Sequence, residues 1–239
     1  EIKFNKSDIV EFEELNQSLS KLIDHTISVY KTQKEFTENA AHELQTPLAI
    51  LKSQLDVLLQ NKDLTERQYN ITEEMNKTLT RSSRINKKLL LLAKIDNSQF
   101  DASEIIKFDA LLQQSIEILK EHFEQKDLSV AVSALPDVEV NGNNILTEVL
   151  INNLLLNAIR HTLSGGSISV TLTESIFQIS NSGSKELNET LLYKRFSRLS
   201  GDNSGSGLGL AIVKEICKVQ RWTIKYRFDN NHHIFSVRI

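Results

Sequence analysis

The sequence contains little cysteine, proline or glycine. Its 239 residues include one Cys, two Pro and eight Gly. A single cysteine excludes an internal disulfide framework, and we expect Cys217 to pack as a small hydrophobic side chain on a helix. With 40% hydrophobic and 25% charged residues, and so few helix-breaking residues, the composition indicates a globular chain rich in helix.

Neither a strong net charge nor a long hydrophobic run is present. Against 31 acidic residues there are 28 basic ones, and a net charge of −3 argues against nucleic acid as a partner. The longest dense apolar run is LLLLA at residues 89–93, whereas a membrane span needs about 18 residues or more. The chain opens at Glu1 on a helical pattern without a signal-like segment, so we expect it to be part of a longer protein.

The first third of the sequence predicts a helical hairpin. From Asp8 to about Gln60 there is no Gly and a single Pro, which predicts one long helix. A break follows at NKDLTERQ, where Asp63 or Thr65 would cap a second helix. Apolar residues at intervals of three, four or more mark a seam on each helix: Leu44, Leu48, Leu51, Leu55 and Leu58, then Ile71, Met75, Leu79, Ile85, Leu89 and Leu92.

A two-helix hairpin cannot bury both seams by itself. Pairing with a second copy would give a four-helix bundle, so we expect a homodimer. The alternative is that the seams pack on the remainder of the same chain.

After residue 98 the pattern alternates between helices and paired strands. Helical patterns at 108–125, 144–161 and 208–219 separate the strand-like stretches LSVAVS, SISVTLT, IFQIS, WTIKYRF and HIFSVRI. The strands fall in pairs with hairpin-length gaps, which favours an α+β domain, with a mixed or antiparallel sheet and helices on one face, over a doubly wound parallel sheet.

The stretch FTENAAHELQTPLAIL, residues 36–51, places a histidine five residues before a proline within the first helix. On a regular helix His42 points roughly 160° away from the leucine seam, and Thr46 lies within about 40° of it. Pro47 cannot donate to the carbonyl of Glu43, so the helix should bend beside the histidine. Two interpretations remain: an exposed nucleophile next to a bending point, or an ordinary surface histidine near a tolerated proline.

Two further stretches suggest phosphate chemistry. Four glycines fall within residues 201–209, just before an apolar-periodic helix, and such a loop offers backbone N–H groups and a helix N-terminus to phosphate. It has neither the preceding strand of a dinucleotide fingerprint nor a Gly-Lys-Ser/Thr of a Walker loop. Asn153 and Asn157 share a helical face, and Arg160 follows about one turn later. These side chains could bind Mg²⁺ and phosphate, or the asparagines could simply face water at the edge of the helix.

In this order, the motifs resemble those of the sensor histidine kinases of two-component systems. FTENAAHELQTPL resembles the phosphoacceptor box, INNLLLNAIRHT the asparagine box, LYKRFSRL the phenylalanine box and GSGLGLAIVKEI the second glycine box. The resemblance implies a dimeric four-helix bundle followed by an α/β-sandwich ATPase domain of the histidine kinase and gyrase type. It divides the chain into a signalling linker helix (1–34), a dimerisation and phosphotransfer domain (35–97) and a catalytic ATP-binding domain (98–239).

The resemblance also implies roles for single residues. His42 would be phosphorylated by ATP and pass the phosphoryl group to an aspartate on the receiver domain of a response regulator, with Glu43 taking up the imidazole proton and Thr46 positioning water for a phosphatase reaction. Asn157 would bind Mg²⁺. The nucleotide site would comprise Asn153, Asn157, Arg160, His161, Asn181, Gly183, Arg198, Gly205, Gly207, Leu208 and Gly209.

At one point the sequence differs from the family pattern. Where the family carries an aspartate for the adenine amino group, this chain has Asn181, and Lys185 replaces a glycine. The substitution leaves open a nucleotide-poor pseudokinase scaffold. An ATP-hydrolysing clamp of the related superfamily is disfavoured, since Asn153 stands where those enzymes carry a glutamate base. The resemblance further implies the cytoplasmic portion of an inner-membrane sensor, tied to the membrane only through a missing N-terminal segment.

Overall fold

The computed structural model describes residues 10–96, 100, 102, 104–197 and 205–239, with the backbone alone at 34, 37, 38, 41 and 42. It divides into two compact units, Glu1–Ala93 and Lys94–Ile239. Each unit is described by itself. No helix in the described ranges combines the length and the hydropathy that crossing a bilayer requires.

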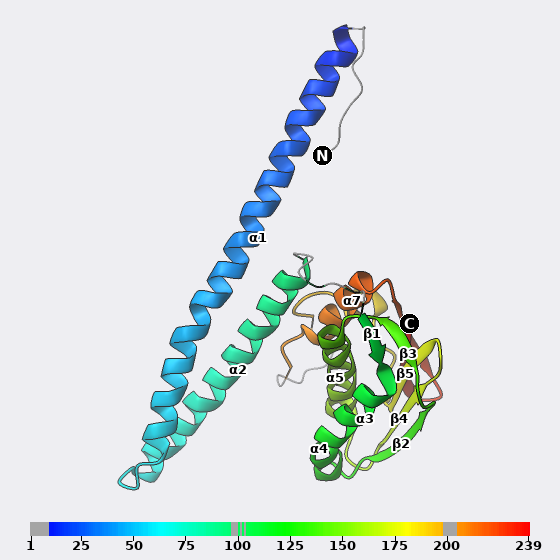
Figure 1. The fold of residues 1–239 in the computed structure, drawn as a ribbon. Helices are drawn as coiled ribbons and strands as arrows, with labels where there is room; N and C mark the ends of the chain where they lie inside the picture. The colour runs from blue at the N-terminus through cyan, green and yellow to red at the C-terminus, as the bar shows by residue number, and fades with distance from the viewer. Residues whose placement is uncertain (1–9, 97–99, 101, 103, 198–204) are drawn as a thin grey trace. The chain divides into compact units, whose positions relative to one another are not determined.

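The first unit is the predicted helical hairpin (Figure 1). Helix α1 runs over Val10–Leu59 and α2 over Glu66–Asp96, of which the last three residues belong to the second unit. Helix α1 continues through Pro47 without interruption, and the predicted bend there stays a prediction. Asn76 on α2 donates to the Asp56 carboxylate on α1 at 3.1 Å, which fixes the register of the two helices.

Helix α2 begins with a capping box. The Thr65 hydroxyl accepts a hydrogen bond from the Gln68 N–H at 3.4 Å, and the Gln68 side chain accepts one from the Thr65 N–H at 2.9 Å. This reciprocal pair satisfies two backbone donors that the helix itself cannot. Thr65, rather than Asp63, is therefore the cap of the two candidates.

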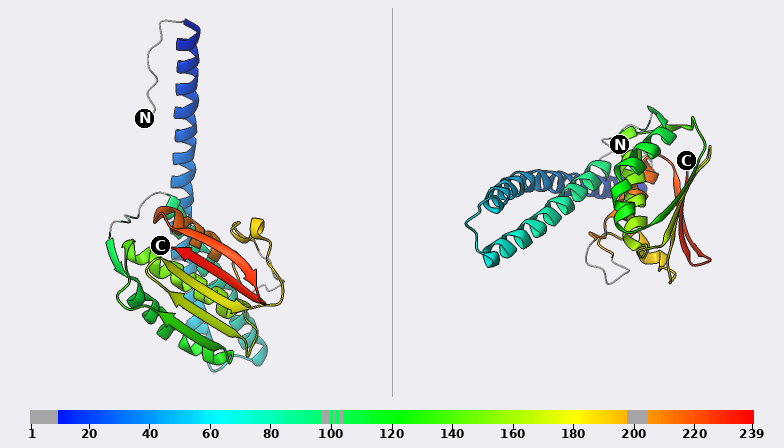
Figure 2. Two further views of the ribbon diagram at one scale, coloured as in Figure 1. Left: turned by 90° about the vertical axis from the view of Figure 1, so that its right-hand side faces the viewer. Right: turned by 90° about the horizontal axis from the view of Figure 1, so that it is seen from below.

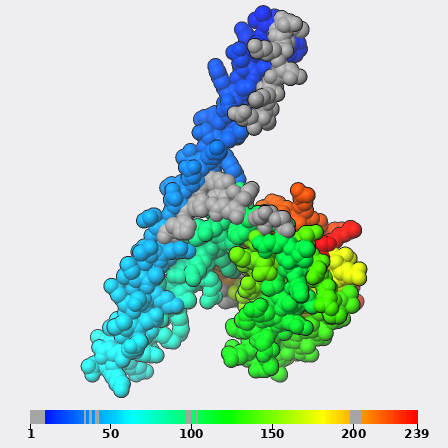
Figure 3. All heavy atoms as spheres, viewed as in Figure 1, coloured from blue at the N-terminus to red at the C-terminus, as the bar shows by residue number. Residues whose placement is uncertain are grey.

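The apolar seams of the hairpin stay partly exposed in the single chain. Leu44 is 54% exposed, Leu51 49%, Ile71 50% and Met75 55%. In the space-filling view of Figure 3 the hairpin is a narrow pair of rods, too thin to enclose a core of its own.

The second unit is an α/β sandwich (Figures 1 and 2). A five-stranded sheet has the order β2 (Ser129–Ala134), β4 (Ser167–Leu172), β5 (Ile176–Ser182), β7 (His232–Arg238) and β6 (Thr223–Asp229). Strand β2 pairs with β4 in parallel and the other pairs are antiparallel, so the sheet is mixed as predicted. A separate antiparallel pair joins β1 (Glu104–Lys107) to β3 (Glu139–Gly142).

Helices cover one face of the five-stranded sheet, which confirms the predicted α+β class (Figure 2). They are α3 (Phe108–Ile118), α4 (Lys120–Gln125), α5 (Asn144–His161) and α7 (Gly209–Val219), while the short α6 (Glu189–Leu192) belongs to the connection between β5 and α7. Phe108 packs between the two layers, 5.0 Å from the ring of Phe177 and 6.1 Å from that of Trp222. Cys217 is a free thiol, 2% exposed on α7, as predicted.

Two details differ from the sequence-based expectation. The helical pattern over 108–125 divides at Leu119 into α3 and α4. The β1–β3 pair was not predicted, because each strand has only four residues and the partners lie about 35 residues apart, so no local pattern marks them.

Candidate functional site

Helix α5 carries the predicted asparagine pair on its partly exposed edge. The helix starts at the cap Asn143, whose side chain accepts from the Leu146 N–H at 3.0 Å, and it buries the leucine and isoleucine face. Asn153, Asn157 and Arg160 are half-buried on the remaining edge. The Asn153 amide donates to the Val149 carbonyl at 2.8 Å, so its Oδ1 is left to face away from its own helix backbone.

The glycine loop before α7 lies against this edge of α5. A Cβ built on Gly205 would lie 3.1 Å from Arg160 Nη1, and one built on Gly209 would lie 3.1 Å from Asn153 Oδ1. The structure therefore brings together two motifs that are about 50 residues apart in the chain. Helix α7 begins at Gly209, so its free N–H groups face the same region as these side chains.

Gly207 is required by both conformation and space. Its φ is +67°, a left-handed value that L-residues rarely adopt, and a Cβ there would lie 2.7 Å from the carbonyl carbon of Phe196. The next residue, Leu208, is fully buried and anchors the loop to the core.

Asn181 lies in the five-stranded sheet, one residue before the end of β5. Its side chain is 1% exposed, and it pairs in register with Ile168 on β4 and His233 on β7. Its Nδ2 donates to the Ser182 carbonyl at 3.2 Å. Two residues later a Cβ on Gly183 would overlap the ring of His233, so the lack of a side chain at Gly183 lets β7 approach.

A lysine that the sequence did not single out holds the end of α5. Lys126 Nζ donates to the carbonyls of Ile159, Arg160 and Thr162, at 2.9, 2.9 and 3.0 Å. A positive charge at the C-terminus of a helix stabilises both the free carbonyls and the helix dipole. Lys126 is more than 30 residues before these carbonyls, so no sequence pattern indicates the contact.

Three predicted residues belong to α1. Glu43 and Thr46 have exposed side chains. The backbone of His42 is helical, but the structure does not describe its side chain. The predicted outward direction of the imidazole therefore stays a prediction. Arg198 also lies outside the described residues. His161 is exposed in the last turn of α5.

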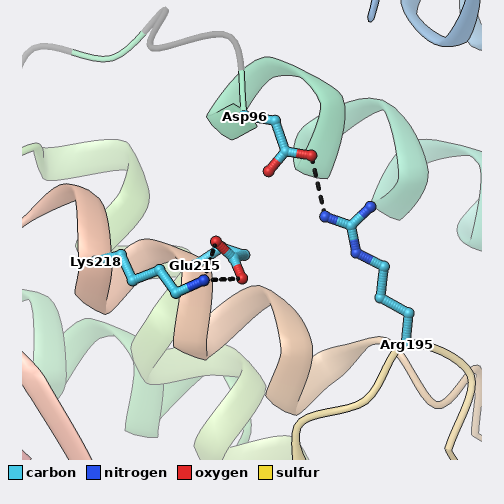
Figure 4. Close-up of polar contacts among 4 residues, drawn as sticks. All are labelled: Asp96, Arg195, Glu215 and Lys218. Carbon is cyan, nitrogen blue, oxygen red and sulfur yellow. Dashed lines mark hydrogen bonds and ion pairs between the residues drawn. The ribbon is translucent and has the colours of Figure 1, made fainter. Parts of the chain in front are cut away.

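Figure 4 shows two ion pairs of the second unit. Arg195, in the segment after α6, contacts the Asp96 carboxylate at 3.0 Å, and Lys218 contacts Glu215 on the same helix at 2.7 Å. The Arg195 and Asp96 side chains are 49% and 32% exposed, so solvent screens the pair and its effect on stability is small.

Buried ionisable groups in this unit are shifted towards their neutral forms. Burial raises the pKa of the Cys217 thiol to about 12 and also raises that of Tyr226. Burial lowers the pKa of His233, with a smaller effect from the neighbouring His232. At neutral pH these three groups are therefore an unreactive thiol, a protonated phenol and a neutral imidazole.

The described residues hold no cluster of three or more His, Cys, Asp or Glu side chains suited to a metal. A metal ion at this site would instead rely on an amide oxygen, such as that of Asn157, together with oxygens of a phosphate ligand and water. Mg²⁺ accepts such a donor set, because it keeps several waters and binds phosphate oxygens.

Two protein-family models match the chain. The model described as "His Kinase A (phospho-acceptor) domain" matches residues 32–98, and the one described as "Histidine kinase-, DNA gyrase B-, and HSP90-like ATPase" matches residues 142–237. The first match includes His42, Glu43 and Thr46. The second includes all the other residues that the sequence predicted for the site.

The chain is also similar to curated and solved proteins. Heme sensor protein HssS of Staphylococcus aureus (strain JH9) is 34% identical over 228 residues, covering 91% of this chain and 49% of that protein. The protein of that name from Staphylococcus saprophyticus subsp. saprophyticus is 30% identical over 227 residues, covering 92% and 47%. The chain thus spans about half the length of the curated relatives it matches.

Among solved structures, full-length ShkA in complex with AMPPNP matches with a TM-score of 0.69 at 20% identity, covering 85% of this chain and 45% of that one. Histidine kinase AdeS of Acinetobacter baumannii matches with a TM-score of 0.58 at 24% identity, covering 83% and 96%. At these identities the likeness establishes the fold.

Proposed function

Because this chain belongs to the sensor histidine kinases of two-component systems, we propose that it phosphorylates itself on His42 with ATP. The phosphoryl group then passes to an aspartate on the receiver domain of a response regulator. One observation carries the proposal: the glycine loop contacts the Asn153 and Arg160 edge of α5, in a chain whose other unit matches a phosphoacceptor domain.

The nucleotide site is proposed to lie along this contact. The N–H groups at the start of α7 and the Arg160 guanidinium supply positive partners for the triphosphate, and Asn181 lies near the adenine. Gly205, Gly207 and Gly209 let the backbone approach the phosphates. The relative ShkA was solved with AMPPNP, an ATP analogue, which supports ATP as the nucleotide. His161 and Arg198 are proposed to add charge near the phosphates.

Mg²⁺ is proposed to be held by the Asn157 side-chain oxygen together with phosphate oxygens. When bound, the ion neutralises charge on the β- and γ-phosphates. The protein groups then have two tasks: the helix N-terminus and Arg160 orient the chain of phosphates, and Leu208 fixes the loop by its burial.

The chemical step is proposed for a ring nitrogen of His42. The nitrogen attacks the γ-phosphorus, the bond from that phosphorus to the β,γ-bridging oxygen breaks, and ADP leaves with the electron pair. Only neutral imidazole is nucleophilic, so Glu43 accepts the proton from the other nitrogen. Thr46, one turn further along α1, is proposed to position water when the chain acts as a phosphatase.

Asn153 makes the site a poor ATPase. A side-chain amide is too weak a base to accept a proton from water. The Asn153 amide nitrogen also already donates a hydrogen bond to the Val149 carbonyl. Water near the γ-phosphate would therefore not be activated, and ATP would remain available for His42.

We infer further that the chain acts as a homodimer and belongs to a membrane-bound protein. The exposed seams of α1 and α2 support dimerisation, because large apolar side chains at helical spacing require a partner. The similarity to a sensor protein about twice as long supports a further sensor portion of the full protein, which would attach the kinase to the inner membrane.

Incubation with γ-labelled ATP and Mg²⁺ tests the proposal. We expect acid-labile label on the unsubstituted chain and none on His42→Ala. His25→Ala is the matched control, since His25 is an exposed histidine on the same helix. Label that persists in His42→Ala would contradict the assignment.

A pseudokinase scaffold is the second candidate, and Asn181 is the observation in its favour. Calorimetry with AMPPNP and Mg²⁺ separates the two functions. A kinase binds the analogue at micromolar to low millimolar concentration, whereas a scaffold shows no heat of binding at several millimolar.

A further inference from the structure

The residues that follow Asn181 are held by the β6–β7 hairpin through contacts outside the sheet. We call residues 183–187, between the end of β5 and α6, the exit segment. The Gly183 N–H donates to the carbonyl of Asn231, in the hairpin turn, at 2.8 Å. The Leu187 N–H donates to the hydroxyl oxygen of Tyr226 on β6 at 3.0 Å.

His233 completes the hold on the exit segment. The Tyr226 hydroxyl lies 3.0 Å from His233 Nδ1. The phenol oxygen accepts from the Leu187 N–H, and the same hydroxyl shares a hydrogen bond with the imidazole, so one hydroxyl links the exit segment to His233. The ring edge that carries Nε2 lies against the backbone of Gly183.

This contact explains why residue 183 is a glycine. Gly183 does not have a left-handed φ, so its backbone conformation is open to other residues. A Cβ would overlap Nε2 and Cδ2 of His233, and the ring cannot retreat, because Phe228 lies 5.0 Å and Tyr226 6.0 Å from it, centroid to centroid. The close approach of His233 alone is sufficient to require glycine here.

The hydrogen bonds of Tyr226 and His233 fix the position of the exit segment, which apolar side chains of the same size would not do. Tyr226 is 8% and His233 8% exposed, so both lose hydration when the domain folds. An apolar pair would fill the same volume without that cost, whereas a hydrogen-bonded chain from Leu187 through Tyr226 to His233 fixes one position for the exit segment. His233 is also the direct cross-strand neighbour of Asn181.

We propose that Tyr226 and His233 are positioning residues for the nucleotide base: they hold the exit segment and Asn181 in the arrangement that receives adenine. The inference rests on the proposed function, since it takes Asn181 to lie in the base site. Neither side chain is proposed to touch the phosphates or to take part in phosphoryl transfer.

Tyr226→Phe tests the proposal, because it removes one hydroxyl and keeps the ring. The matched control is Ser236→Ala, which removes a hydroxyl that joins two neighbouring strands of the same sheet, β7 and β5, by a 3.0 Å hydrogen bond to Gln178. We expect the Kd for AMPPNP with Mg²⁺ to rise about tenfold in Tyr226→Phe and to change less than about twofold in Ser236→Ala.

The kinetic readout separates positioning from loss of structure. Autophosphorylation of Tyr226→Phe should show a raised KM for ATP and, at saturating ATP, a rate within about twofold of the unsubstituted chain. Unchanged affinity in Tyr226→Phe, or an equal loss in Ser236→Ala, would overturn the inference while leaving the proposed function standing. No binding by the unsubstituted chain would overturn the proposed function itself.

A double-mutant cycle tests the role of His233. Gly183→Ala should weaken AMPPNP binding about tenfold or more, because the methyl group displaces the His233 ring. In a His233→Ala background the same methyl group should cost less than about twofold, since the ring is absent. An equal cost in both backgrounds would mean that the nucleotide, and not His233, requires the glycine.

Discussion

At the scale of single residues, the site depends on groups whose orientation or backbone conformation is restricted. Asn153 uses its amide N–H on its own helix and presents the oxygen to the α7 loop, while Gly207 accepts a backbone conformation that other residues resist. The chemistry proposed for the site therefore depends on small groups placed at fixed points.

The glycine loop allows a comparison of two substitutions. In Gly207→Ala the new Cβ meets backbone atoms of Phe196 and Ser197 at 2.7–2.9 Å and must also adopt a left-handed φ, which costs about 1–2 kcal/mol by itself. In Gly209→Ala the nearest atom is a side-chain oxygen at 3.1 Å. We expect Gly207→Ala to lose AMPPNP binding in calorimetry and Gly209→Ala to lose only part of it.

The lowered pKa of His233 predicts a pH dependence of stability. A histidine whose folded pKa lies below its unfolded value of 6.5 favours the folded state fully above pH 6.5. That stability is lost as the pH falls through the lower, folded pKa. Urea unfolding at pH 7.5 and pH 5.5 should therefore show a decrease in unfolding free energy that is smaller in His233→Gln. An equal decrease in both would contradict the prediction, and His25→Gln is the control.

At the scale of secondary-structure elements, α5 is the frame of the site. Asn143 caps its first turn and Lys126 caps its last, so both ends of the helix that carries Asn153, Asn157 and Arg160 are tied to other parts of the domain. Gln220, just after α7, accepts from the Asn143 N–H at 2.7 Å and so joins α7 to the start of α5.

Lys126→Met should loosen the end of α5. It removes three charge-assisted hydrogen bonds to carbonyls and should cost about 2 kcal/mol of unfolding free energy, measured by urea titration. Hydrogen exchange should accelerate in the last turn of α5. Lys120→Met is the control, because Lys120 is exposed on α4 and its Nζ lies 4.0 Å from the exposed Glu117 carboxylate. A cost as small as that of the control would show that the capping is unimportant.

The sequence predicted elements well wherever the pattern was local. The bounds of α5 follow from a regular apolar period between Asn143 and Thr162, and the length of α1 follows from the absence of glycine. Contacts between distant segments were not predictable: Lys126 with the end of α5, Tyr226 with Leu187, and the β1–β3 pair. Each needs the folded topology, because nothing in either segment indicates its partner. The glycine, asparagine and histidine motifs stood out by their residues and spacing, but the spacing left their roles open, and only the resemblance to a family suggested those roles.

At the scale of the whole molecule, the exposed helical seams support the proposed homodimer. Leu51 and Met75 are 49% and 55% exposed, and charges placed there would lie inside the proposed four-helix bundle. We expect Leu51→Glu and Met75→Glu to convert a dimer into a monomer in sedimentation velocity. Ser53→Glu, on the opposite face of α1, should leave the dimer intact. Monomers in the unsubstituted chain at micromolar concentration would contradict the proposed homodimer.

The isolation of the single thiol has a practical consequence. Cys217 is 2% exposed, and burial raises its pKa to about 12, so thiolate-directed reagents leave it unmodified in the folded protein. A second cysteine introduced on the surface of α1 or α7 would therefore be the sole site of maleimide attachment. Spin labels or fluorophores placed on a pair of such cysteines can report distances within the native chain without prior removal of its own cysteine.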